Sequence, residues 1–135
     1  MMQKTRLILL TIAVVTGLAA CQEAPVLKKV TIPEAASLVA SNTGNLQIVD
    51  LRTPGEIAAT GALPAAVFMD YMAPGFPAKM EQLDKKRPVL LYCASGARSA
   101  AAAAVLHQQG FQTVYDMSEG MNGWLGRGNK TELVR

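Results

Sequence analysis

Four consecutive apolar residues, Val89-Leu90-Leu91-Tyr92, restrict the fold of this chain more than any other feature of the sequence. An uninterrupted apolar run of this length is typical of a strand covered on both faces, as in a parallel sheet. A short loop with a glycine at its middle follows, and the alanine-rich stretch Arg98–Gln109 predicts a helix that stops at Gly110. The pattern therefore predicts a buried strand that leads directly into a helix.

The same alternation runs along most of the chain. Thr31 and Thr53 each precede a proline in the first helical turn and a glutamate three positions on, which predicts two helices that begin with capping boxes. Further strands are predicted over residues 46–51, 66–69 and 113–117, and further helical segments over 79–86 and 120–125. Strands that alternate with helices predict an α/β fold: a single domain with a mostly parallel central sheet flanked by helices on both faces.

Charge and composition exclude some classes of partner. The formal net charge of the 135 residues is +3, and Lys4 and Arg6 contribute two of the positive charges from a segment that we expect to be removed. The remainder is close to neutral, so we expect no nucleic-acid partner. Apart from Cys21 the chain has one cysteine and one histidine, which do not make a ligand cluster, so we expect no metal and no cofactor.

The N-terminus has the character of an export signal. Lys4 and Arg6 precede a mostly apolar run over residues 7–18, which is too short to span a bilayer. Leu18-Ala19-Ala20-Cys21 then resembles the bacterial lipobox, which implies cleavage before Cys21 and attachment of acyl chains to it. Ordinary cleavage after Ala20, with Cys21 left as a free thiol, is the alternative.

This resemblance implies a location. We expect a periplasmic protein that is anchored to a bacterial membrane through Cys21, and Gln22 at the next position weakly favours the outer membrane. The expected organisation is a signal peptide over residues 1–20, the lipidated cysteine and a polar tether over 21–29, one folded domain over 30–126, and a C-terminal tail over 127–135.

Cys93 lies where parallel sheets bind ligands, at the carboxyl end of the strongest strand. Backbone N–H groups of a tight loop and of a helix N-terminus can form a cradle for an anion. We expect this anion-binding loop to comprise Ala94, Ser95, Gly96, Ala97 and Ser99. Arg98 is permanently charged and can brace the loop or bind an anion. These surroundings favour the thiolate of Cys93, although a free cysteine at a strand end can also be a small buried apolar residue.

The order of the motifs resembles the rhodanese family over about residues 28–126. Asp50-Leu51-Arg52 with Glu56 is similar to the Asp-x-Arg and Glu of the family, and the segment 92–99 is similar to its catalytic loop. The segment 120–124 resembles the closing Gly-Gly-x-x-x-Trp motif of the family. The segment 61–66 stands in place of Gly-His-Ile-Pro-Gly-Ala, with Ala62 for the histidine and Ala65 for the second glycine.

The resemblance implies a sulfurtransferase in which Cys93 and Arg98 are the catalytic residues. The Cys93 thiolate would take sulfur from thiosulfate or a similar small anionic donor and hold it as a persulfide. A thiol, cyanide or the cysteine of a partner protein would then accept the sulfur. Four residues separate Cys93 from Arg98, as in rhodaneses, whereas the related dual-specificity phosphatases have five.

Two questions stay open at this level. Asp50 and Arg52 are expected to support the edge of the site, but a purely structural contact between Arg52 and Glu56 is an equal alternative. The rival function is a non-catalytic persulfide carrier or a redox-sensing module that binds a periplasmic partner.

Trp124 and Phe76 are expected to pack in the core, and His107 to lie on a helix without a catalytic role.

Overall fold

Strand β4 (Val89–Tyr92) lies at the centre of a five-stranded sheet, and all four of its residues are buried. The computed structural model describes residues 23–134 of the chain. The strand order is β1-β5-β4-β2-β3, and every neighbouring pair is parallel. The other strands are β1 (Val26–Val30), β2 (Gln47–Asp50), β3 (Val67–Phe68) and β5 (Thr113–Met117).

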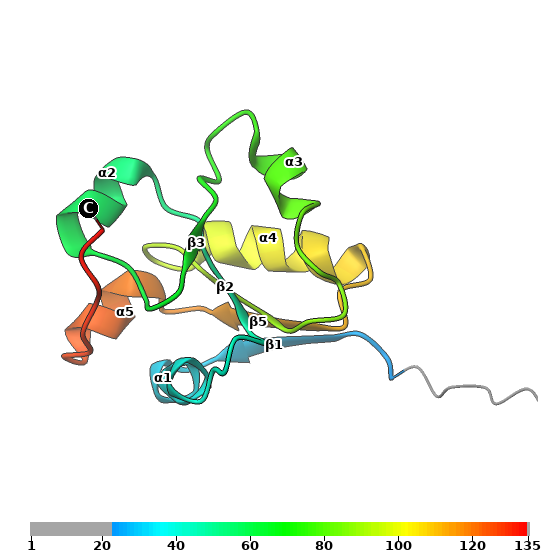
Figure 1. Ribbon diagram of the computed structural model, residues 1–135, viewed down its shortest axis with the longest axis horizontal. Helices are drawn as coiled ribbons and strands as arrows, with labels where there is room; N and C mark the ends of the chain where they lie inside the picture. Colours follow the sequence, from blue (N-terminus) through cyan, green and yellow to red (C-terminus); the bar gives the residue numbers. More distant parts are fainter. Residues whose placement is uncertain (1–22, 135) are drawn as a thin grey trace, which may run out of the picture.

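The side chains of β4 alternate between two hydrophobic clusters, one on each face of the sheet. Val89, Leu91 and the following Cys93 point toward α3 (Phe76–Met80) and α4 (Ala97–Gln108). Leu90 and Tyr92 point toward α1 (Ile32–Ala40) and α5 (Gly120–Gly126), where Trp124 is buried. Figure 1 shows these helices on opposite sides of the sheet. The expected α/β fold, with a parallel sheet covered on both faces, is confirmed.

Both predicted capping boxes are present. The Glu34 carboxylate accepts a hydrogen bond from the backbone N–H of Thr31 at 2.8 Å, at the start of α1. The Glu56 carboxylate accepts the equivalent bond from Thr53 at 2.8 Å, at the start of α2 (Pro54–Thr60). These contacts satisfy N–H groups that have no partner inside the helix, and they fix where each helix begins.

Two expectations about secondary structure are wrong. Residues 26–29, expected to belong to the tether, form most of β1, which pairs in register with β5. Only Val30 of this strand is buried, so its backbone rather than an apolar pattern holds it at the sheet edge. The helix expected over 79–86 instead spans Phe76–Met80, because the apolar pair Phe76 and Met80 faces the core and proline is tolerated in a first turn.

The C-terminal tail is part of the folded unit. Ala62 and Glu132 exchange two backbone hydrogen bonds of 2.9 and 2.8 Å, and the indole of Trp124 donates to the Lys130 carbonyl at 2.9 Å. Gly61, with φ of 74°, permits this approach, since a Cβ there would lie 2.5 Å from the Glu132 carbonyl oxygen. Figure 1 shows the tail (red) running from α5 to α2. Within residues 23–134, no helix is long and apolar enough to cross a bilayer.

Ala65 has a φ of 58°, in the left-handed region that favours glycine. We expect Ala65→Gly to leave the free energy of unfolding unchanged or to raise it by up to ~1 kcal/mol, because relief of backbone strain offsets the added freedom of the unfolded chain. The matched control is Ala101→Gly, at an exposed position inside α4, which should cost about 1 kcal/mol. Urea unfolding measures both, and an equal loss in the two variants would contradict the left-handed assignment.

Candidate active site

Cys93 follows β4 directly, and its side chain is on the α4 face of the sheet with 1% of its surface exposed. The backbone N–H of Gly96 donates a hydrogen bond to the sulfur at 3.1 Å. Burial acts to raise the pKa of the Cys93 thiol, but hydrogen bonds from the backbone of Ser99, Gly96 and Ser95 outweigh it, and the pKa lies below its ordinary value. The loop therefore stabilises a thiolate without a histidine base.

The shape of the loop depends on close contact with the turn between β5 and α5. Gly96 has a φ of 99°, and a Cβ there would collide with the carbonyl oxygen of Ser118. Gly120 has a φ of 61°, and a Cβ there would collide with the carbonyl oxygen of Ala94. A glycine of the Cys93 loop thus packs against the backbone of the turn before α5, and a glycine of that turn packs against the backbone of the loop. No larger residue fits at either position.

The start of α5 controls where the loop carbonyls point. The backbone N–H groups of Met121 and Asn122 donate to the carbonyls of Cys93 and Ala94 at 2.8 and 3.0 Å. These two carbonyl oxygens are therefore bound by α5, and the next N–H groups of the loop are left to face the sulfur. The segment 120–124 has no part in the site that the sequence predicts. The feature that could have indicated its part is Gly120, the glycine at which the segment begins.

Arg98 is held by Glu56 through a bidentate ion pair. Its Nη1 and Nη2 donate to the two carboxylate oxygens at 2.9 and 2.7 Å, and the side chains are 22% and 35% exposed. Arg98 is the main cause that lowers the pKa of Glu56 to about 2. The pKa of Arg98 is raised, first by its hydrogen bonds to Glu56 and also by the charge of Cys93. The contact between Arg52 and Glu56, the expected structural alternative, is not formed.

Asp50 and Arg52 form a buried network on the other side of the sheet. Arg52 is 2% exposed, and its Nε and Nη2 donate to the Asp50 carboxylate at 2.9 and 2.6 Å. The Tyr92 hydroxyl donates to the same carboxylate at 2.7 Å. Arg52 also donates to the carbonyl of Gly61 at 2.8 Å, and so it ties the end of α2 to the end of β2. The pair supports α2, which carries Glu56, and does not contact the Cys93 sulfur.

Ser99 contributes its backbone N–H to the expected anion cradle, and its side chain makes a further contact behind the sulfur. Its side chain is fully buried, with the hydroxyl 3.9 Å from the Cys93 sulfur and 2.6 Å from an oxygen of Asp116. Ala94, Ser95 and Ala97 are at least partly exposed at the mouth of the loop. Asp116 was missed in the sequence, where the signal was a single acidic residue inside the strand pattern 113–117.

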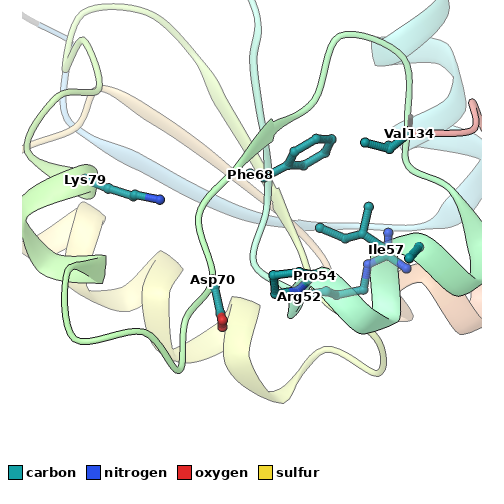
Figure 2. A pocket seen from close by; sticks show the side chains of 8 residues that line it. Arg52, Pro54, Ile57, Phe68, Asp70, Lys79 and Val134 are labelled. Atoms are coloured by element: carbon teal, nitrogen blue, oxygen red, sulfur yellow. The ribbon is translucent and has the colours of Figure 1, made fainter.

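Two hollows are lined in part by Arg52. One of about 200 Å³ borders the loop directly, between Ala94 and α2. The other, of about 210 Å³, has mostly apolar walls at the ends of β2 and β3, and Figure 2 shows Phe68 pointing toward Val134 of the tail on one side of it. The residues that line this second hollow are Arg52, Pro54, Ile57, Ala58, Phe68, Asp70, Lys79 and Val134.

The lowered pKa of Glu56 predicts a defined dependence of stability on pH. The ionised carboxylate stabilises the fold above its ordinary pKa, and that contribution is lost as the pH falls from about 5 toward 2. We expect Glu56→Gln to be less stable than the wild type near pH 7, by about 0.5–1 kcal/mol, and the difference to shrink toward pH 2. Urea unfolding over this pH range measures it; a difference that does not change with pH would contradict the assignment.

Glu34→Gln is the matched control, because Glu34 occupies the same capping box at α1, its pKa is also lowered to about 2, and it pairs with Lys28 instead. In both variants the difference in stability from the wild type should shrink over the same range of pH. Only Glu56→Gln should change the ratio of Cys93 alkylation by anionic iodoacetate to that by neutral iodoacetamide. We expect an increase of about threefold, the effect of one unbalanced charge ~6 Å away in water.

Comparisons with known proteins agree with this geometry. Residues 33–127 match the family model of the rhodanese-like domain. A sulfurtransferase of Allochromatium vinosum is 38% identical over 95 residues, which are 70% of this chain and 86% of that protein. The crystal structure of a rhodanese-like domain protein from Staphylococcus aureus matches with a TM-score of 0.64 and 26% identity, covering 78% of this chain and 98% of that chain.

A solution structure of the polysulfide-sulfur transferase from Wolinella succinogenes matches with a TM-score of 0.61 and 26% identity, covering 82% of this chain and 80% of that chain. The family match begins inside α1 and ends after α5, and so it includes the Cys93 loop, the Arg98–Glu56 pair and the glycine at position 120 that the loop packs against. On these grounds the chain belongs to the rhodanese-like domain family.

Proposed function

We propose that this protein is a sulfurtransferase that carries sulfur on Cys93 as a persulfide. The observation that supports this most directly is the set of backbone N–H groups around the Cys93 sulfur, which lower the pKa of the thiol in spite of its burial. A thiolate is the nucleophilic form of cysteine, and the same N–H groups can stabilise the negative charge of a persulfide. The relative from Allochromatium vinosum is named a sulfurtransferase, which agrees with the proposal.

The reaction we propose has two displacement steps and needs no cofactor. The Cys93 thiolate attacks the outer sulfur of thiosulfate or a similar donor; a new S–S bond forms while the S–S bond of the donor breaks, and sulfite or a thiolate leaves with the electron pair. A thiolate or cyanide then attacks the outer sulfur of the persulfide and releases the Cys93 thiolate. Arg98, held by Glu56, contributes positive charge at the loop where the anionic donor enters.

The burial of Cys93 favours a second candidate function. With 1% of its surface exposed, Cys93 offers a donor or an acceptor little direct access to its sulfur. A non-catalytic persulfide carrier, or a redox-sensing module that meets a periplasmic partner, would need only slow exchange at this sulfur. The two functions differ in turnover, which can be measured.

The full chain should convert thiosulfate and cyanide to thiocyanate, and Cys93→Ser should abolish the product because the attacking sulfur is gone. Cys21→Ser is the matched control, since it removes the other cysteine of the chain and should retain activity. Thiocyanate formation is followed by colorimetry. A folded wild type that forms no thiocyanate would contradict the enzyme; if mass spectrometry then shows one added sulfur atom on Cys93, the carrier is favoured.

We also propose that the protein is periplasmic and is held on a bacterial membrane by acyl chains on Cys21. Cys21 and the apolar segment before it lie outside the described residues, and the proposal rests on their sequence. Because β1 begins at Val26, only four residues, 22–25, separate the anchor from the sheet. Such a segment spans no more than about 18 Å, so the domain would lie close to the membrane surface.

In a bacterial host, the wild type should sediment with membranes and be released by detergent. Cys21→Ser should instead be soluble or remain uncleaved, because the residue that carries the acyl chains is absent. Fractionation followed by intact-mass measurement checks this. Wild-type protein that is found in the soluble fraction, with the mass expected for cleavage after Ala20 and no lipid, would establish the ordinary signal peptide instead.

A further inference from the structure

Asp116 is a buried acidic residue that the proposed reaction does not use. It lies on β5, faces α4, and is 2% exposed. One of its carboxylate oxygens accepts a hydrogen bond from the Ser99 hydroxyl at 2.6 Å. Ser99 is itself fully buried and lies directly behind the Cys93 sulfur. Asp116, Ser99 and Cys93 therefore form one connected row inside the protein.

The Ser99 hydroxyl has a single proton and three acceptors around it. They are the Asp116 carboxylate at 2.6 Å, the Gly96 carbonyl at 3.1 Å and, once it is a thiolate, the Cys93 sulfur at 3.9 Å, which as a thiol donates to the Ser99 oxygen instead. The bond to an ionised carboxylate is the shortest and the strongest of the three. While Asp116 is charged, the Ser99 hydroxyl thus donates to its carboxylate, and the sulfur depends mainly on hydrogen bonds from the backbone, with only a long contact of 3.9 Å to the Ser99 hydroxyl.

A neutral Asp116 reverses this arrangement. A protonated carboxyl group can donate its own O–H to Ser99, and the Ser99 hydroxyl is then free to turn and donate to the sulfur. We propose that Asp116 is a positioning residue for Cys93, which acts through the single proton of Ser99 and withholds it from the sulfur as long as the carboxylate is charged. This inference rests on the proposed function only for its consequences in sulfur transfer, and not for the hydrogen-bond geometry.

The groups that face Asp116 decide how readily it becomes neutral. Lys29 of β1 is its partner across the strand pair, Ser99 faces it from α4, and Cys93 lies beyond Ser99 at the end of β4. Burial raises the pKa of Asp116, while the bond from Ser99 and the charge of Lys29 lower it, and the pKa lies above its ordinary value. An anion forming at Cys93 raises it further, so the two groups titrate as a coupled pair.

This coupling has opposite effects on the two steps of sulfur transfer. A thiolate that lacks the Ser99 hydrogen bond is more basic and attacks a donor sulfur faster. In the release step the Cys93 sulfur is the leaving group, and a hydrogen bond from Ser99 makes it leave more easily. Charged Asp116 favours loading of sulfur, and neutral Asp116 favours its release.

The test is the thiolate pKa of Cys93 in Asp116→Asn, which resembles the neutral form. Titration of the thiolate absorbance of the full chain, with Cys93→Ser subtracted to remove Cys21, should show the pKa lowered by about one unit, a tenfold change in the thiolate-to-thiol ratio. Asp70→Asn is the matched control: Asp70 lines the second hollow, away from Ser99, and its replacement should leave the titration unchanged. A pKa that is unchanged or raised in Asp116→Asn overturns the proposal.

The route through Ser99 is tested by the same substitution in a Ser99→Ala background. Most of the shift should disappear there; an equal shift in both backgrounds would mean that the charge acts through space, and the role of the Ser99 proton would be overturned. Separate measurement of the two steps should show loading per thiolate about threefold slower and release faster in Asp116→Asn. The titration needs no sulfur transfer, so it decides the role of Asp116 even if the proposed activity fails.

Discussion

The contact between the Cys93 loop and the turn before α5 is the constraint on which the rest of the site depends. Two glycines, Gly96 and Gly120, allow the two backbones to meet, and the first N–H groups of α5 bind the carbonyls of Cys93 and Ala94. With those carbonyls turned away, the backbone of the loop presents its N–H groups to the sulfur. The electrostatics of the site thus follow from backbone geometry rather than from a charged side chain, and Arg98 adds to a field that the loop already provides.

Side chains alternate between the two faces of the sheet, so the reactive residues lie on one face and residues that support the site lie on the other. Cys93, with Ser99 and Asp116 beside it, lies on the α4 face, while Asp50 and Tyr92 lie on the face covered by α1 and α5. The two faces are still connected mechanically. Arg52 fixes the end of α2, α2 carries Glu56, and Glu56 holds Arg98 at the loop. Loss of the buried pair of Asp50 and Arg52 would therefore affect the site by shifting α2.

The central strands and the cysteine loop could be predicted because their signals are local. Val89–Tyr92 is uninterrupted, both capping boxes are complete, and each glycine in the loop region follows a clear strand. Strand β1 could not be predicted, because it is exposed along most of its length and is stabilised by backbone pairing with a segment more than eighty residues away. The partner of Arg98 and the role of Asp116 depend on which helix face meets which strand, which only the packed structure determines.

Both ends of the described segment, residues 23–134, contribute to the folded unit. β1 precedes the segment that matches the family, and the backbone bridge of the tail to Ala62 follows it. A fragment cut to residues 33–127 would leave β5 as an open edge, ready to pair with another chain, and would remove Val134 from the wall of the second hollow. The segment that matches the family is thus shorter than the segment that folds. An expression fragment with the bounds of the family match would lose β1.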